Sequence, residues 1–434
     1  MRRAKRDGNG RRVAAAAVVA ALVLAACSNA TQTVSTGSNA APGVTANKIV
    51  VGSLSTQSGP IAADFAPIVP GVQAYFDMVN AAGGVDGRKI DLAYNLDDAS
   101  NPTTNASDTR TLVEQDHVFA VVGVATFSFT GATYLAQTGT PTFGYVTSND
   151  WSPYPNLFGS FGSYLDYSTS EPFFAYAAKK VGAKSAAVIA YNVPASADEC
   201  KAAAAGFAKF GVHVGFEDLA AGLEGTNITP EVLRMKQAGV DFVVSCMDVT
   251  GNIALARTMQ QNGMTGIHQI WLDGYDRSVL AQYPQLMANT MFLVQHVPYE
   301  AATEFHGAFP ALATYLQEMK RYEPAYAYNE VAFDGWISAA LFVQGLRAAG
   351  HDLTQGKLVA AINKMTDFTG GGLTQPISWK TAHSQVTSPT CNTFVEATPT
   401  GFKTVFNNGT HLYVCFKNNG GLAPVAAPPG TPGG

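Results

Sequence analysis

Residues 49–100 read IVVGSLSTQSGPIAADFAPIVPGVQAYFDMVNAAGGVDGRKIDLAYNLDDAS, and the order of the elements in this stretch decides the fold. The apolar run at 49–54 is typical of a buried strand, and residues 72–83 have the apolar spacing of an amphipathic helix. A second strand-like run follows at 90–96. Strands that are separated by a helix of this length are expected to lie parallel in one sheet.

The alternation of strands and helices continues through most of the chain. Further strand-like runs lie at 118–124, 141–146, 185–191, 212–218, 241–246, 268–272 and 289–294, and long helical patterns lie at 305–321 and 327–349. The runs fall into two sets, which predict an α/β fold of two doubly wound lobes, each with a parallel sheet covered by helices on both faces. Ligands bind such sheets beyond the carboxyl ends of their strands.

The first 26 residues indicate a secretory signal rather than part of the fold. Six Lys and Arg residues within residues 2–12 precede the apolar run at 13–26, which is shorter than the ~20 residues of a membrane-spanning helix. The next residue is Cys27, and the ending Leu-Ala-Ala-Cys resembles the lipobox of bacterial lipoproteins, in which the cysteine is lipidated. The alternative is an ordinary signal peptide that happens to precede a cysteine.

Both ends of the remaining chain have the composition of segments without a packed core. Residues 27–47 are rich in Ser, Thr, Asn and Ala, and residues 420–434 are rich in Pro and Gly. Such segments cannot bury enough apolar surface to fold. We therefore expect a flexible tether at 27–47 and a disordered tail at 420–434.

Composition and the absence of known motifs argue against several classes of function. Removal of residues 1–26 takes away six bases and one acid and moves the net charge from −5 to −10, and the remaining chain has no basic cluster, which argues against binding to nucleic acid. It contains no G-x-x-x-x-G-K-[ST], H-E-x-x-H, C-x-x-C or G-x-S-x-G, the motifs of phosphate loops, zinc sites and α/β-hydrolases. His213, His268 and His296 are expected to be packed or at the surface. We therefore expect no cofactor, no metal and no enzyme activity.

Four cysteines remain in the body of the chain. They are Cys200, Cys246, Cys391 and Cys415, which allow three pairings, and export makes disulfides chemically permissible. We favour Cys200–Cys246 and Cys391–Cys415, because CNTFVEA and HLYVCF look like two strands of a hairpin. Free buried thiols are the alternative.

Three pieces of residues 49–100 carry a resemblance to a known family. They are the Ser-Gly-Pro turn at 58–60, the connection NAAGGVDGRKI at 80–90, and the pair Asp97–Asp98 after the second strand. Together they closely resemble the start of leucine/isoleucine/valine-binding-type proteins, the solute-binding components of ABC importers, which have the type I periplasmic-binding-protein fold. The stretch NEVAFDGWISAALFVQGLRAAG at 329–350 resembles the family's return helix. The resemblance covers most of residues 48–380.

The resemblance implies that three crossover segments join the two lobes, and we place them near 160–168, 296–299 and 375–382. Lobe 1 is then formed by residues 48–165 and 298–378, and lobe 2 by residues 166–297 and 379–419. The resemblance also implies closure of the lobes around a ligand about these hinges.

The stretch VVGVATFSFTGAT at 121–133 places a hydroxyl-rich loop after an apolar strand. No placed base could activate these hydroxyls for catalysis, and the resemblance implies that loops here and after the next strand hold a ligand carboxylate. The candidates on lobe 1 are Gln57, Ser58, Ala125, Thr126, Ser128, Tyr145, Thr147 and Ser148. For Thr126, Ser128 and Thr147 the alternative is a role as helix N-caps, which does not exclude contact with a ligand.

Lobe 2 is expected to supply charged and aromatic contacts, and the candidates are Tyr191, Asp248, Asp273 and Tyr275. Asp273 matches the family's acid that receives the ammonium group of the ligand, and Asp248 follows the preceding strand. A solvated turn aspartate is the alternative for both, and Tyr275 either walls the pocket or packs on the surface. The family often carries a tyrosine against the ligand side chain in the loop after the first strand of lobe 2, where the nearest match in this chain is Ala195 or Ser196 and Tyr191 lies several residues earlier. Whether branched-chain specificity carries over is therefore open.

The resemblance and the lipobox together predict an extracytoplasmic solute-binding lipoprotein of an ABC importer. It would be a monomer that is anchored to the bacterial cell membrane through lipid on Cys27 and that contacts the permease subunits. The solute would be an amino acid, an amide, a small organic acid or a related small polar or amphiphilic molecule. The alternative is a ligand-sensing lipoprotein of the same fold that signals to a membrane receptor.

Overall fold

The computed structural model describes residues 41–167, 172–407, 411–418 and 420–433. The expected signal peptide at 1–26, Cys27 and most of the expected tether lie outside these residues. Within the described ranges, no helix has both the length and the apolar character that crossing a membrane requires.

Lobe 1 is built on a parallel sheet with the strand order β2-β1-β3-β4-β5. Its strands are β1 (Lys48–Ser55), β2 (Lys89–Asp97), β3 (Ala120–Ala125), β4 (Thr142–Gly144) and β5 (Leu157–Gly159). Its helices are η1 (Ala62–Asp64), α1 (Ile68–Ala81), α2 (Pro102–Arg110), η2 (Thr111–Gln115), α3 (Ala132–Thr138) and η3 (Asn149–Trp151). The sequence of β3 is AVVGVA and every residue in it is buried, as expected for a central parallel strand.

Lobe 2 is built on a sheet with the order β12-β11-β10-β9-β8-β6-β7, and β13 also pairs with β11. Its strands are β6 (Ser185–Tyr191), β7 (His213–Ala221), β8 (Phe242–Cys246), β9 (His268–Trp271), β10 (Thr290–Val294), β11 (Thr390–Thr398), β12 (Gly401–Val405) and β13 (Val414–Phe416). Its helices are α4 (Pro172–Lys180), α5 (Pro194–Lys209), η4 (Leu223–Gly225), α6 (Thr229–Gln237), α7 (Val249–Gln261) and α8 (Arg277–Gln282).

One edge of the lobe 2 sheet is antiparallel, although we expected two parallel sheets. β6 to β10 are parallel, whereas β11 runs antiparallel to β10, β12 and β13. The connection between β11 and β12 is too short for the crossover that parallel strands need, so these two strands form an antiparallel hairpin. The α/β fold with two parallel-rich sheets is otherwise as predicted.

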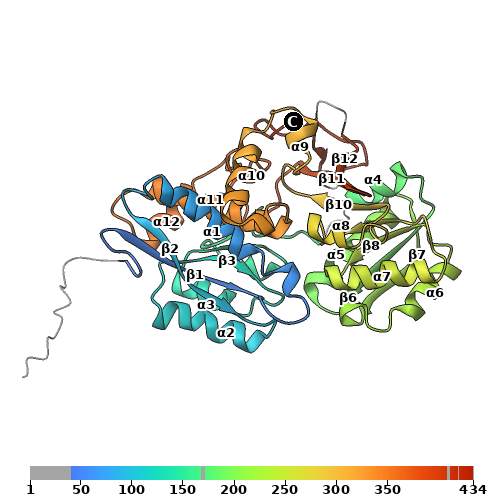
Figure 1. Cartoon of the computed structure of the whole chain (residues 1–434), viewed down its shortest axis with the longest axis horizontal. Helices are drawn as coiled ribbons and strands as arrows, with labels where there is room; N and C mark the ends of the chain where they lie inside the picture. Colours follow the sequence, from blue (N-terminus) through green and yellow to red (C-terminus); the bar gives the residue numbers. More distant parts are fainter. Residues whose placement is uncertain (1–40, 168–171, 408–410, 419, 434) are drawn as a thin grey trace, which may run out of the picture. The chain divides into compact units, whose positions relative to one another are not determined.

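The chain passes between the two sheets three times: after β5, after β10 and before β11. The segment between β10 and β11 holds α9 (Ala301–Glu304), α10 (Pro310–Tyr322), η5 (Pro324–Tyr326), α11 (Glu330–Ala349) and α12 (Gln355–Ile362). Of these, α11 packs against α1 and against β3 and β4, so it belongs to lobe 1. Figure 1 shows α11 beside α1 over the lobe 1 sheet.

Two glycines allow α1 and α11 to approach each other closely. A Cβ atom on Gly71 of α1 would lie 1.8 Å from the carbonyl oxygen of Ala332, and one on Gly335 of α11 would lie 2.1 Å from that of Ile68. Neither position therefore accepts a larger residue without movement of a helix. This approach fixes the N-terminal turns of α11, which carry Glu330 and Asp334.

Both disulfides are present with the pairing that we favoured. The Cys200–Cys246 bond joins α5 to the end of β8, and the Cys391–Cys415 bond joins directly opposed residues of β11 and β13. The two runs that looked like a hairpin do pair, but β12 lies between them in the sequence and also pairs with β11.

Residues 420–433 pack against the body of the protein, in contrast to the disordered tail that we expected. The backbone N–H of Val425 donates to the carbonyl of Cys415 at 2.9 Å, and that of Leu412 donates to the carbonyl of Gly433 at 2.9 Å. Val425 and Ala427 contact the hydrophobic core. The Pro and Gly content prevents regular structure, but the apolar side chains between these residues still gain from burial.

The close approach of α1 and α11 predicts that a single methyl group added at Gly71 destabilises the protein. We expect Gly71→Ala to lower the free energy of unfolding by about 1–3 kcal/mol, because the helices must separate. Gly356→Ala in α12 is the matched control, since a Cβ there meets no atom within 4 Å. The control is expected to be neutral or to stabilise by up to about 1 kcal/mol. Denaturant titration of both variants measures this, and equal effects would contradict the assignment.

Candidate ligand site

A cavity of about 350 Å³ is lined by residues of both lobes. On lobe 1 its walls come from the loops after β1, β3 and β4, from the segment after β5, and from the start of α11. On lobe 2 they come from the end of β6, from α5, and from the residues after β8, β9 and β10. The carboxyl ends of the strands of both sheets therefore face one space, which is where α/β sheets bind ligands.

Five of the candidate residues from the sequence line this cavity. They are Tyr145, Thr147, Tyr191, Asp248 and Asp273. Asp248 caps α7, since its carboxylate accepts the backbone N–H groups of Thr250 (2.9 Å) and Gly251 (3.1 Å), and it also accepts the hydroxyl of Tyr191. Asp248 is 7% exposed, so it is a buried cap rather than a solvated turn residue.

Two other candidates on lobe 1, Gln57 and Ser58, are hydrogen-bonded to the end of β2. The Gln57 side chain donates to Asn95 (2.8 Å) and to the carbonyl of Leu96 (3.1 Å), and the backbone N–H groups of Gln57 and Ser58 donate to Asp97. These two residues do not line the cavity.

The hydroxyl-rich loop after β3 is likewise mostly turned away from the cavity. Ala125 is fully buried in the core, and the Thr126 hydroxyl donates to the buried carboxylate of Asp98. α3 begins at Ala132, so Thr126 and Ser128 are not its caps. Ser148 donates to Asp150 at 2.7 Å. The reason is local competition, because nearby acids accept these hydroxyl groups: Asp98 directly after β2 accepts that of Thr126, and Asp150 accepts that of Ser148.

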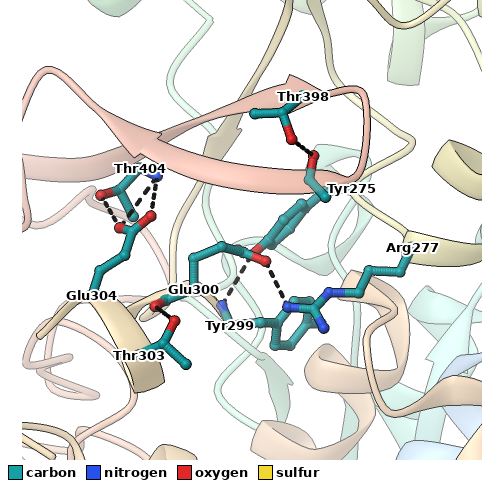
Figure 2. Close-up of polar contacts among 9 residues, drawn as sticks. Tyr275, Arg277, Tyr299, Glu300, Thr303, Glu304, Thr398 and Thr404 are labelled. Atoms are coloured by element: carbon teal, nitrogen blue, oxygen red, sulfur yellow. Dashed lines mark hydrogen bonds and ion pairs between the residues drawn. The ribbon is translucent and has the colours of Figure 1, made fainter. Parts of the chain in front are cut away.

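Tyr275 is fully buried and lies in a polar network with Arg277, Tyr299 and Glu300 (Figure 2). Its hydroxyl donates to Glu300 and accepts the backbone N–H of Tyr299 at 2.9 Å. Arg277 donates to the same Glu300 at 2.9 Å. Tyr275 therefore neither walls the cavity nor packs on the surface, and it anchors the loop that carries Asp273.

Sequence reasoning missed three acids that complete the site: Asp64, Glu330 and Asp334. Asp64 accepts the backbone N–H of Val249 at 3.2 Å, so it joins lobe 1 to the start of α7 in lobe 2. Glu330 accepts the backbone N–H groups of Gly274 (3.0 Å) and Tyr275 (3.1 Å), across the same boundary.

A sequence signal for these acids did exist. Glu330 and Asp334 are the only charged residues in the first sixteen residues of an apolar helix, and their spacing of four places them on one face. A second cavity of about 350 Å³ also includes Asp64, Asp273 and Glu330 in its lining, so these three acids lie between two spaces.

The acids of the cavity hold their protons more tightly than exposed carboxyls do. Burial and the charge of Asp273 raise the pKa of Glu330 to about 8, and burial with the charge of Asp248 raises the pKa of Asp273 to about 7. Burial raises the pKa of Asp334 to about 7, and that of Asp64 also lies well above its usual value. Carboxylates that share a site poor in water cannot all be charged.

His296 lies against the same cavity as a neutral hydrogen-bond acceptor. Burial lowers its pKa to about 4, and the ring Nδ1 lies 2.9 Å from the carbonyl of Val297. The proton of the neutral ring is therefore on Nδ1, which leaves Nε2 as an acceptor. His296 is 2% exposed and Nε2 has no hydrogen-bond partner in the described part of the chain. We expected a packed or surface histidine, and this ring is packed.

The lining of the cavity contains few groups that could balance the acids. Lys417 is the only Lys or Arg among the described residues that line it, and its side chain is exposed. No group of three or more His, Cys, Asp or Glu residues within the described ranges could hold a metal ion.

Comparison with known protein families agrees with a cavity between two α/β lobes. The model of the periplasmic binding protein family matches residues 48–401. The chain belongs to the periplasmic binding protein family. Its members bind solutes and are not enzymes, which agrees with the expectation from the sequence. A comparison with curated proteins gives no match.

Solved structures of this family share the fold. A fatty acid ABC transporter substrate-binding protein from Thermomonospora curvata has 19% identity and a TM-score of 0.71, over 91% of this chain and 98% of that one. A branched-chain amino acid ABC transporter protein from Thermus thermophilus with bound valine has 16% identity and a TM-score of 0.69, over 86% and 97%. A solute-binding protein from R. palustris in complex with benzoate has 16% identity and a TM-score of 0.66, over 89% and 99%.

The raised pKa of Asp334 predicts how stability depends on pH. A carboxyl whose pKa rises from 3.8 to about 7 on folding stabilises the fold fully below pH ~4, and this contribution is lost as pH rises to ~7. We expect Asp334→Asn to remove up to about 1.4 kcal/mol per pH unit from the slope of unfolding free energy over that range. Denaturant titrations from pH 4 to 8 measure it.

Asp352→Asn is the control for the loss of one carboxyl, because this side chain is 91% exposed. The slope of its unfolding free energy against pH should equal that of the unmodified protein. Equal slopes for all three proteins would contradict the burial of an ionisable Asp334.

Proposed function

We propose that this protein is the extracytoplasmic solute-binding component of an ABC importer, which captures a small polar solute, such as an amino acid or a related molecule, and presents it to a membrane permease. Family membership supports binding without chemistry. The observation that carries the proposal is the cavity between the strand ends of two sheets, with residues of both lobes in its walls.

The contacts across the lobe boundary support capture by closure. Asp64 and Glu330 of lobe 1 accept backbone N–H groups of lobe 2 beside the cavity. These bonds form only when the lobes are together, so a solute that fills the cavity and the hydrogen bonds around it favour the same state. A solute that binds the closed state better shifts the protein toward it.

The site contains enough polar groups for useful affinity. Micromolar binding needs about −8 kcal/mol, and a hydrogen bond to a charged group contributes ~1.5–3 kcal/mol. The binding free energy from several such bonds and from some apolar burial, after subtraction of the entropy lost on association, lies in that range. In this proposal Asp273 is the principal partner of the solute's ammonium group, while Tyr145, Thr147 and Tyr191 complete the walls.

We also propose that residues 1–26 direct export and that Cys27 carries the lipid that holds the protein at the cell membrane. The support is the basic start, the short apolar run and the Leu-Ala-Ala-Cys ending. Residues 27–40 would then connect the anchor to the folded body. The anchored protein would remain close to its permease.

A thermal-shift screen of residues 41–434 tests the binding function. The panel contains amino acids, amides, alkyl amines, aromatic acids and small dicarboxylates. A true ligand at a hundred times its Kd adds about 2.7 kcal/mol of stability, so we expect at least one compound to raise the melting temperature by a few degrees. A panel without any such compound would count against the proposal.

A second experiment tests the anchor. We expect the full chain, produced in a bacterium that processes lipoproteins, to fractionate with membranes and to carry an acyl mass on its N-terminal cysteine. Cys27→Ser should be found in the soluble fraction or remain as the uncleaved precursor without an acyl mass. The proposal fails if the unmodified chain has no acyl group.

A further inference from the structure

The cavity offers hydrogen-bond acceptors and negative charge, with little to balance them. Asp64, Glu330 and Asp334 come from lobe 1, and Asp248 and Asp273 come from lobe 2. The charges that raise the pKa of Asp64, Asp273, Glu330 and Asp334 are all those of other acids in this set. Lys417, the one lining base among the described residues, is exposed.

Three buried acceptors in the lining have no partner among the described residues. Oδ2 of Asp64 is buried and unpaired, although Oδ1 of the same carboxylate is bonded to Val249. Nε2 of His296 and Oε1 of Gln375 are the others. The side chains of Asp64 and His296 are 5% and 2% exposed, and His296 lies in the segment that follows β10. Unpaired buried acceptors are costly, so they favour a ligand that brings donors.

A further acid lies elsewhere in the same cavity. Glu199 of α5 lines it beside Tyr167, and burial raises the pKa of Glu199 to about 7. Glu199 lies in the second turn of α5, whereas the five acids named above lie in η1, in the first turns of α11 and directly after β8 and β9. The cavity therefore has acidic groups on different elements of its wall.

We propose that the cavity binds a solute of net positive charge with two separated amine groups, such as an alkyl diamine or a polyamine. One ammonium group lies among Asp64, Asp273, Glu330 and Asp334, and the other lies at Glu199. An ammonium group has three donors and no acceptor, which suits the unpaired acceptors in the lining of the cavity. A solute carboxylate at either place would face repulsion. This inference rests on the proposed binding function and specifies the chemical class of its solute.

Proton linkage follows from the same arrangement. The groups that face Asp273 are the carboxyls of Asp64, Asp248, Glu330 and Asp334 and the phenol of Tyr145. With pKa values near 7 to 8, part of these carboxyls are protonated at neutral pH when no solute is bound. A bound cation favours the ionised form, so binding releases protons and the affinity increases as pH rises from 6 to 8.

Three matched series of compounds test the inference by calorimetry on residues 41–434. They are α,ω-diamines, ω-amino acids and α,ω-dicarboxylates with chains of four to eight carbons, which differ only in their end groups. We expect a diamine to bind at least tenfold more tightly than the amino acid and the dicarboxylate of the same length. We also expect proton release, measured by comparison of buffers with different ionisation enthalpies.

Charge-neutral variants locate the two amine groups. We expect Asp273→Asn and Glu199→Gln each to weaken diamine binding about tenfold or more, because a charge-assisted contact is lost. A monoamine of the same length should be sensitive to one of the two changes only. Asp352→Asn, an exposed acid outside the cavity, should bind the diamine with unchanged affinity.

The outcomes separate this inference from the proposed function. Tightest binding of an amino acid or dicarboxylate would overturn the cationic class, and binding of any other solute from the thermal-shift panel without diamine binding would do the same while the importer function stands. Diamine binding that is unaffected by both variants would also overturn it. A protein that binds no compound of either panel would contradict the proposed function itself.

Discussion

The carboxyl groups of Asp64, Asp273 and Glu330 meet in a place with little water and no neighbouring base among the described residues, and the rest of the site is organised around them. Their raised pKa values show the cost of this position, since burial and the charges of neighbouring acids disfavour the ionised form of each. A fold retains such a cost where a functional group needs it. Asp64 and Glu330 also accept backbone N–H groups of the opposite lobe. The same carboxyl groups therefore carry the unfavourable charge of the site and hold the two lobes together.

Several elements hold these acids in position. The close approach of α1 and α11 at Gly71 and Gly335 fixes the helix start that carries Glu330 and Asp334. On lobe 2, the network of Tyr275, Arg277 and Glu300 anchors the loop after β9, as Figure 2 shows. Because the backbone on both sides is held in place, the acceptor groups already have fixed positions before a solute binds. Less conformational entropy of the protein is therefore lost on binding.

The strand and helix order could be predicted from the sequence, because buried parallel strands are short apolar runs and their helices have a clear period. The disulfide pairing could be predicted as well, since the runs that contain Cys391 and Cys415 are strand-like. The antiparallel edge and the packing of residues 420–433 could not be, because both depend on tertiary contacts of short segments with weak local preferences. A composition rich in Pro and Gly excludes helices but does not exclude burial.

The site was predicted less well than the fold, and Thr126 shows why. Its position after a strand is right for a ligand contact, but the buried Asp98 accepts its hydroxyl. A sequence does not show whether such a hydroxyl group will donate its hydrogen bond to a ligand or to a neighbouring side chain. Asp64 and Glu330 were missed for the complementary reason, since each becomes part of a site only through bonds to the other lobe.

Hydrogen–deuterium exchange at the backbone amides of Val249, Gly274 and Tyr275 tests the central claim most directly, because these amides donate to Asp64 and Glu330 across the lobe boundary. The experiment compares the free protein with the protein saturated by the compound that stabilises it most. If solute binding and closure of the lobes are coupled through these acids, exchange at the three amides slows on binding, while exchange in the centre of β3 is unchanged. Saturation with that compound and no change at the three amides would contradict the account.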